Sequence, residues 1–140
     1  MGELVVRGFK AAKFTALGAL VASASLLSAP SASAADGDTS VWIRLWDTQT
    51  DVNATANFKA YGDQLSVCDN LADGYGAWAG LYKFVYNGNG TFIKSVSAGG
   101  KGNCRTNTKN VEEGTVVWIK VCITKDGQNL RCKWSDYGHA

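Results

Sequence analysis

The side chains that most often carry out catalysis are scarce in this chain. Its 140 residues contain one histidine, His139, which lies next to the C-terminus. Chain ends are often poorly ordered, and a serine or cysteine nucleophile activated by histidine would have to use this residue. We therefore predict no catalytic residue of the Ser-His-Asp or Cys-His kind.

Carboxylates offer a second kind of chemistry, because glycoside hydrolysis uses two of them across the scissile bond. The candidates for such a pair are Asp47, Asp51, Asp69, Asp73, Glu112 and Glu113. Nothing in their spacing selects two that would face each other. A small secreted hydrolase or toxin with a carboxylate site is therefore the alternative function rather than the first one.

Residues 69–76 carry several oxygen atoms of the kind that calcium prefers. In an EF-hand loop beginning at Asp69, the third position would be an oxygen ligand and the twelfth a glutamate. These two positions hold Leu71 and Gly80. Asx turns, in which an aspartate side chain bonds to the backbone two residues on, are the simpler interpretation. We predict no metal and no cofactor.

Aromatic residues are the best indication of a binding function. Two sets lie on single faces of predicted strands, namely Trp42, Arg44 and Trp46, and Tyr82, Phe84 and Tyr86. Exposed aromatic rings stack on ligands, bind cations or anchor protein interfaces. The alternative is that each set belongs to the core or covers a disulfide. Trp42, Arg44 and Trp46 are the candidate ligand-binding residues.

The four cysteines, an even number, all follow residue 34. This number in an exported chain indicates two disulfides. A zinc site would need closely spaced ligand pairs of the Cys-x-x-Cys type, which the sequence lacks. Of the three possible pairings, we predict Cys122–Cys132 across a hairpin and Cys68–Cys104 between more distant segments.

The hairpin is predicted over residues 113–134. Residues 115–124 alternate strictly, with Val117, Ile119 and Val121 on one face, and a ten-residue alternation of β-branched and apolar types is a strong strand signal. Asp126-Gly127 is a turn dipeptide. The apolar face should meet the core, and the face with Trp118 should be half covered.

Shorter strands are predicted over residues 41–46, 56–61, 64–68, 78–86 and 91–98, separated by turn residues. Residues 99–110 are predicted to form a long loop that carries Cys104. No helical periodicity follows residue 34. These patterns predict an all-β fold, an antiparallel β-sandwich of about 7–8 short strands, with a small β-barrel as the alternative.

The first 34 residues have the features of a secretory signal peptide: a basic start, an apolar run and the small-residue site Ala32-Ser33-Ala34. We expect residues 35–140 to form a single secreted β domain of 106 residues. Cleavage would remove three of 14 basic and one of 12 acidic residues, leaving eleven of each. A neutral domain has no general attraction to nucleic acid or to anionic membranes.

The segments VCDNLADGYGAWAGLY, GTVVWIKVCI and LRCKW, with the alanine-rich N-terminus, resemble a group of small secreted two-disulfide proteins of actinomycetes such as Streptomyces. The resemblance covers most of the predicted domain. It implies secretion and a β fold, and it transfers no catalytic or binding residue. The sequence therefore predicts a secreted, non-enzymatic binding module, whose partner is an extracellular protein, which it would inhibit, or a cell-wall glycan.

Overall fold

The computed structural model describes residues 37–88 and 90–140 of the chain, so the predicted signal peptide lies outside the described residues. The regular secondary structure of the described residues consists of strands alone, which are β1 (Thr39–Ile43), β2 (Ala54–Lys59), β3 (Gln64–Asp69), β4 (Gly76–Lys83), β5 (Thr91–Gly99), β6 (Asn103–Asn107), β7 (Val116–Lys125), β8 (Gln128–Trp134) and β9 (Gly138–His139). In this part of the chain, no helix is long and apolar enough to cross a membrane.

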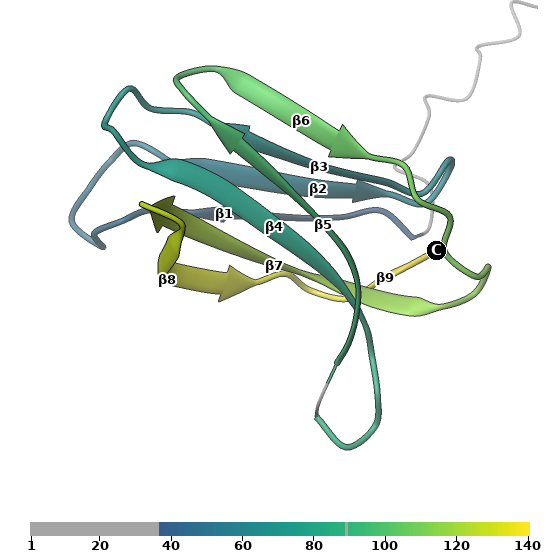
Figure 1. Ribbon diagram of the computed structural model, residues 1–140. Helices are drawn as coiled ribbons and strands as arrows, with labels where there is room; N and C mark the ends of the chain where they lie inside the picture. The colour runs from purple at the N-terminus through teal and green to yellow at the C-terminus, as the bar shows by residue number, and fades with distance from the viewer. Residues whose placement is uncertain (1–36, 89) are drawn as a thin grey trace, which may run out of the picture.

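Two antiparallel sheets form the predicted sandwich (Figure 1). One sheet has the order β1-β2-β3-β6, and the other has the order β5-β4-β7-β8 with β9 also paired to β7. The fold class predicted from the sequence is thus confirmed. The described residues form nine strands, two more than the segments predicted from the sequence, namely β6 and the two-residue β9.

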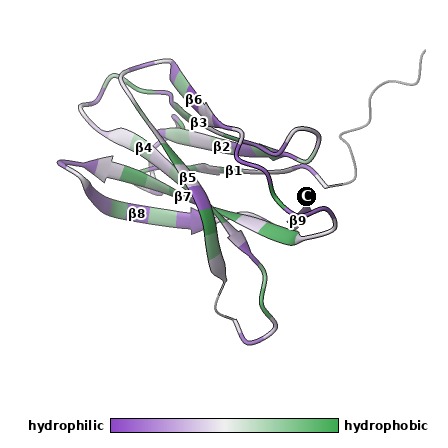
Figure 2. Ribbon diagram, turned by 45° about the vertical axis from the view of Figure 1, so that its right-hand side comes forward, coloured by the Kyte–Doolittle hydropathy of each residue, from purple (hydrophilic) through white to green (hydrophobic). Residues whose placement is uncertain are grey.

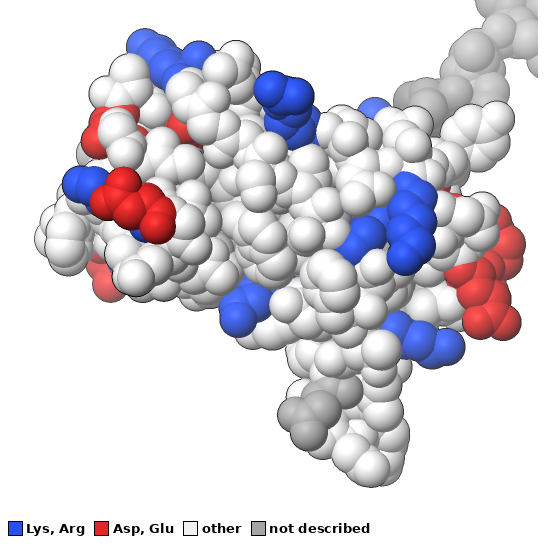
Figure 3. All heavy atoms as spheres, viewed as in Figure 1, with Lys and Arg blue, Asp and Glu red and all other residues white. Residues whose placement is uncertain are grey.

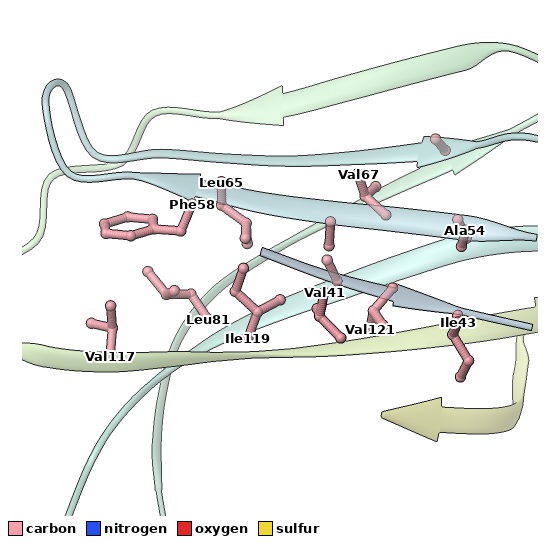
Figure 4. Packing of buried hydrophobic residues seen from close by; sticks show 14 of the residues in the cluster. Val41, Ile43, Ala54, Phe58, Leu65, Val67, Leu81, Val117, Ile119 and Val121 are labelled. Carbon is pink, nitrogen blue, oxygen red and sulfur yellow. The ribbon is translucent and has the colours of Figure 1, made fainter. Parts of the chain in front are cut away.

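The core lies between the inner faces of the two sheets. On β7 the alternate residues Val117, Ile119, Val121 and Ile123 are fully buried, as the period of two predicts. Figure 4 shows side chains of the two sheets, such as Phe58 and Leu81, pointing toward one another. Residues of high and low hydropathy alternate along the strands (Figure 2). Burial of each large aliphatic side chain stabilises the fold by about 1.5–3 kcal/mol.

The expectation of a loop over residues 99–110 is wrong, because this segment contains β6. Four of the five residues of this edge strand are exposed, so no apolar alternation marks it in the sequence. It pairs with β3 so that Cys104 lies directly opposite Cys68. The disulfide Cys68–Cys104 and the hairpin disulfide Cys122–Cys132 are both present, which confirms the predicted pairing.

The C-terminus is tied to the sheet, contrary to the expectation for a chain end. His139 pairs with Val116 of β7, and the backbone N–H of Gly114 donates to the carbonyl of Ala140 over 2.7 Å. Ala140 is buried, whereas the side chain of His139 is exposed. Backbone hydrogen bonds thus hold this end of the chain against the sheet. Almost any residue type can form them, so they leave no pattern in the sequence.

Lys94 of β5 is a charged residue that points into the sandwich. It is 3% exposed, and its Nζ donates to the carbonyl oxygens of Asp63 and, over 2.6 Å, of Lys109. Burial lowers the pKa of Lys94, although the nearby charge of Asp63 opposes this shift. The side chain therefore joins β5 to the β2–β3 turn and to the segment before β7.

Candidate functional site

The residues predicted to bind a ligand are only partly brought together. Trp42 is 46% exposed and Trp46 is 65% exposed, so neither belongs to the core. The Arg44 guanidinium carbon lies 4.7 Å from the centre of the Trp42 ring. β1 ends at Ile43, however, and Trp46 lies in the loop beyond it. The three residues therefore do not share one strand face.

A larger aromatic surface lies on the outer face of the five-stranded sheet. Its members, which we call the aromatic platform, are Tyr82, Phe84, Phe92, Trp118, Trp134 and Tyr137. Trp134, Phe92 and Tyr137 are 41%, 52% and 54% exposed. Two of these residues, Tyr82 and Phe84, were singled out from the sequence. Tyr86, predicted to share their face, lies in the β4–β5 loop and outside these ring contacts.

Trp118 is the centre of the platform. Its ring lies 4.6 Å from Trp134 and 5.4 Å from Tyr137, measured between ring centres, and is nearly parallel to Tyr137. Phe84 meets both Trp118 and Tyr137 edge-on. Edge-to-face and offset arrangements are the favoured geometries of aromatic pairs, so the rings support one another in fixed positions.

Strand alternation and register place the first part of the platform. Trp118 and Lys120 alternate with the buried residues of β7, so they point to the outer face. Trp134 of β8 is directly opposite Lys120, and the disulfide Cys122–Cys132 lies one same-face position further along the hairpin. The disulfide thus fixes the register that brings Trp134 beside Trp118.

The last part of the platform comes from the irregular segment between β8 and β9. At this point the Oγ of Ser135 accepts a hydrogen bond from the backbone N–H of Ile119 over 2.8 Å. The pairing of β8 stops at Lys120, and the first two residues of β7 pair with β9 instead. Irregularities in strand pairing redirect side chains. Here Tyr137 stacks on Trp118 from outside the regular ladder.

Two glycines allow the rings and the β4–β5 loop to approach closely. A Cβ on Gly80 would lie 2.4 Å from Cη2 of Trp78 and 2.9 Å from the ring of Tyr82. A Cβ on Gly90 would lie 2.7 Å from Nε1 of Trp118. Since contacts below about 3 Å between such atoms are repulsive, larger residues would displace the rings.

An open hollow of about 550 Å³ lies over the platform. Its lining combines aromatic rings with polar groups and consists of Tyr82, Gly88, Gly90, Trp118, Lys120, Trp134, Ser135, Asp136 and Tyr137. The ammonium group of Lys120 lies 5.5 Å from the Trp134 ring. The indole N–H of Trp118 is buried and has no hydrogen-bond partner among the described residues.

None of the six carboxylates that the sequence offers for catalysis lines the hollow. Asp69 and Asp73 accept the backbone N–H groups of Leu71 and Tyr75, two residues on, as the predicted Asx turns require. Among the residues that line the hollow, Asp136 is the one carboxylate. Within the described part of the chain, no cluster of three potential metal ligands occurs.

Comparison of the chain with models of protein families, with curated proteins and with solved structures finds no match. Sequence reasoning could have placed Trp134 near Trp118, since the predicted Cys122–Cys132 pair fixes the hairpin register. It had no signal for Tyr137, which enters the platform from an irregular segment.

Proposed function

We propose that this protein is a secreted, non-enzymatic binding module whose ligand surface is the aromatic platform. The observation that carries the proposal is the set of rings, with neighbouring centres 4.6 to 5.9 Å apart, beside an open hollow of about 550 Å³. A hollow of this size is in the range of small-molecule sites, about 300–1,000 Å³. The two disulfides are typical of extracellular proteins.

The ligand class that fits this surface best is a glycan. A sugar ring presents an apolar C–H face that can pack on an aromatic ring, surrounded by hydroxyl groups that need hydrogen-bond partners. The hollow supplies both kinds of contact, with the rings of Trp134 and Tyr137 next to the charged groups of Lys120 and Asp136. Rings locked against one another also lose little conformational freedom on binding.

The same geometry favours binding over hydrolysis. Glycoside hydrolases use two carboxyl groups, about 5–5.5 Å or 6.5–9.5 Å apart according to mechanism. Asp136 is alone in the hollow among the described lining residues. The proposed role of the surface is therefore to hold a ligand rather than to cleave it.

Binding to glycans can be tested directly with Trp134→Ala and Tyr137→Ala. Loss of an aromatic anchor at a binding site costs about 2 kcal/mol or more, so each variant should bind about thirtyfold more weakly. Retention is measured by electrophoresis through gels that contain soluble neutral glycans and by sedimentation with purified cell walls. Melting temperatures are recorded for each variant.

The matched control is Tyr61→Ala, because Tyr61 is also highly exposed but lies in the β2–β3 turn of the other sheet. It should bind as the unaltered protein does. Unchanged binding by both platform variants would refute the proposed surface. Recovery of a protein partner from culture supernatant, without retention on any glycan, would refute the ligand class.

A further inference from the structure

A second groove, of about 260 Å³, lies where the end of β1 faces β8. Arg131 and Lys133 alternate along β8 with Cys132 and Trp134, so they point away from the aromatic platform and toward β1. Trp42 and Arg44 form the other side of the groove. The groove is thus built from both sheets and is separate from the hollow over the platform.

The groove carries an excess of positive charge. Three basic side chains, Arg44, Arg131 and Lys133, line it together with one carboxylate, Asp47. Arg131 already has partners, because its guanidinium donates to the carbonyl of Leu45 over 2.9 Å and forms an ion pair with Asp47. Arg44 and Lys133 are therefore the two cations for which the lining of the groove offers no second carboxylate.

Arg44 and Lys133 are held by an aromatic ring rather than by a carboxylate. Their charged groups lie 4.7 and 4.2 Å from the centre of the Trp42 ring, an arrangement that attracts cations without neutralising them. Within residues 37–88 and 90–140, neither forms an ion pair. The Nε of Arg44 is also buried and has no hydrogen-bond acceptor among these residues.

An anionic group bound in the groove would accept a hydrogen bond from the Nε of Arg44. It would also neutralise the charges of Arg44 and Lys133. Carboxylate and phosphate oxygens form charge-assisted hydrogen bonds with arginine and lysine that are stronger than neutral ones. The indole of Trp42, which is about half exposed, lies beside these charges and provides a surface against which the rest of the ligand can pack.

We infer that this groove binds the acidic group, a carboxylate or a phosphate, of an acidic glycan. The inference rests on the proposed function for the glycan and on the groove itself for the acidic group. A carboxylate and a phosphate would make the same charge-assisted contacts with arginine and lysine. The polymers used in the experiment distinguish the two groups.

The experiment measures retention of the full secreted protein on three polymers. Polygalacturonate carries carboxylates, its fully methyl-esterified form is the neutral counterpart, and poly(glycerol phosphate) carries phosphodiesters. The groove variants are Arg44→Gln and Lys133→Gln. Lys101→Gln, in the exposed β5–β6 turn, removes the same charge elsewhere. Melting temperatures confirm that each variant is folded.

We expect an acidic polymer to be retained, and each groove variant to bind it about tenfold more weakly, as for the loss of one charge-assisted hydrogen bond. Added salt should weaken the retention, and Lys101→Gln should leave it unchanged. The polymer that is retained identifies the acidic group. Failure to retain either acidic polymer, or an equal loss with Lys101→Gln, would overturn the inference.

The outcomes separate this site from the aromatic platform. If Trp134→Ala abolishes retention on a neutral glycan while Arg44→Gln leaves acidic polymers bound, the groove inference fails and the platform stands. If no neutral glycan is retained but acidic polymers bind in a manner that depends on Arg44 and Lys133, the platform proposal fails and the groove stands.

Discussion

Gly80 is a residue on which the geometry of the platform depends. It lies on β4 between Trp78 and Tyr82, and the rings of both side chains cover it. Glycine in a strand interior usually weakens the strand, and it is found where other groups must approach the backbone closely. Here the approaching groups are two aromatic rings on the ligand-facing side of the sheet.

Gly80→Ala is expected to destabilise the protein by about 1–3 kcal/mol, because the added methyl group would lie 2.4 Å from the Trp78 ring in the present arrangement. Urea denaturation measures the change. Gly99→Ala is the matched control, since a Cβ at Gly99 would meet no atom within 4 Å. The control should be unchanged or gain about 0.4–1 kcal/mol. Equal stabilities of the two variants would contradict this prediction, because the rings of Trp78 and Tyr82 would then move aside without a loss of stability.

At the scale of elements, β6 makes little apolar contact with the core. Its residues from Asn103 to Thr106 are exposed, so little apolar burial holds it in place. It is joined to β3 by backbone pairing, by the Cys68–Cys104 disulfide and by a 2.8 Å hydrogen bond between the hydroxyls of Ser66 and Thr106. The disulfide replaces the anchoring that buried hydrophobic side chains give to strands such as β7.

Removal of this disulfide in Cys68→Ser/Cys104→Ser should therefore release β6 before the rest of the fold. The chain-entropy model predicts a loss of about 4 kcal/mol for a closure between residues 36 apart in sequence. Hydrogen exchange should show lost protection of the β6 amides, with β4 and β7 still protected. In the control Cys122→Ala/Cys132→Ala, β6 should keep its protection. Persistent protection of β6 without its disulfide would contradict this account.

At the scale of the whole molecule, the chain after residue 34 is formally neutral, with eleven basic and eleven acidic residues. On the face shown in Figure 3, basic and acidic side chains both occur, and no single sign covers the surface. Such a surface gives no general attraction to polyanions. Any binding of an acidic ligand therefore has to come from a local arrangement such as the groove beside Trp42.

The sequence of the full chain predicts that the protein is exported. Expression of the full chain in a secreting bacterial host should give a product that starts at Ala35, because Ala32-Ser33-Ala34 has the small residues that signal peptidase requires. Intact-mass spectrometry should also show the loss of four hydrogens for the two disulfides. Ala34→Leu is the control and should block cleavage at this position. A secreted product that retains Met1 would refute the prediction.

The strands with one buried face can be read from the order of the amino acids alone. Val117, Ile119 and Val121 are predicted and found in the core, since the alternation of a strand is a local property that can be read along the chain. The two disulfides followed from the cysteine count and the hairpin register. β6 and β9 escaped prediction, because an exposed edge strand and a two-residue strand depend on pairing partners rather than on their own residues.

Which aromatic and charged residues lie together depends on how the two sheets and their connections pack. Sheet order and an irregular segment bring Tyr137 onto Trp118, and the packing of the two sheets brings Lys133 onto Trp42 across more than half of the domain sequence. Such contacts depend on the relative placement of segments distant in the chain, for which residue type and periodicity carry no information. The sequence therefore determined the scaffold, whereas the tertiary structure determined both candidate binding surfaces.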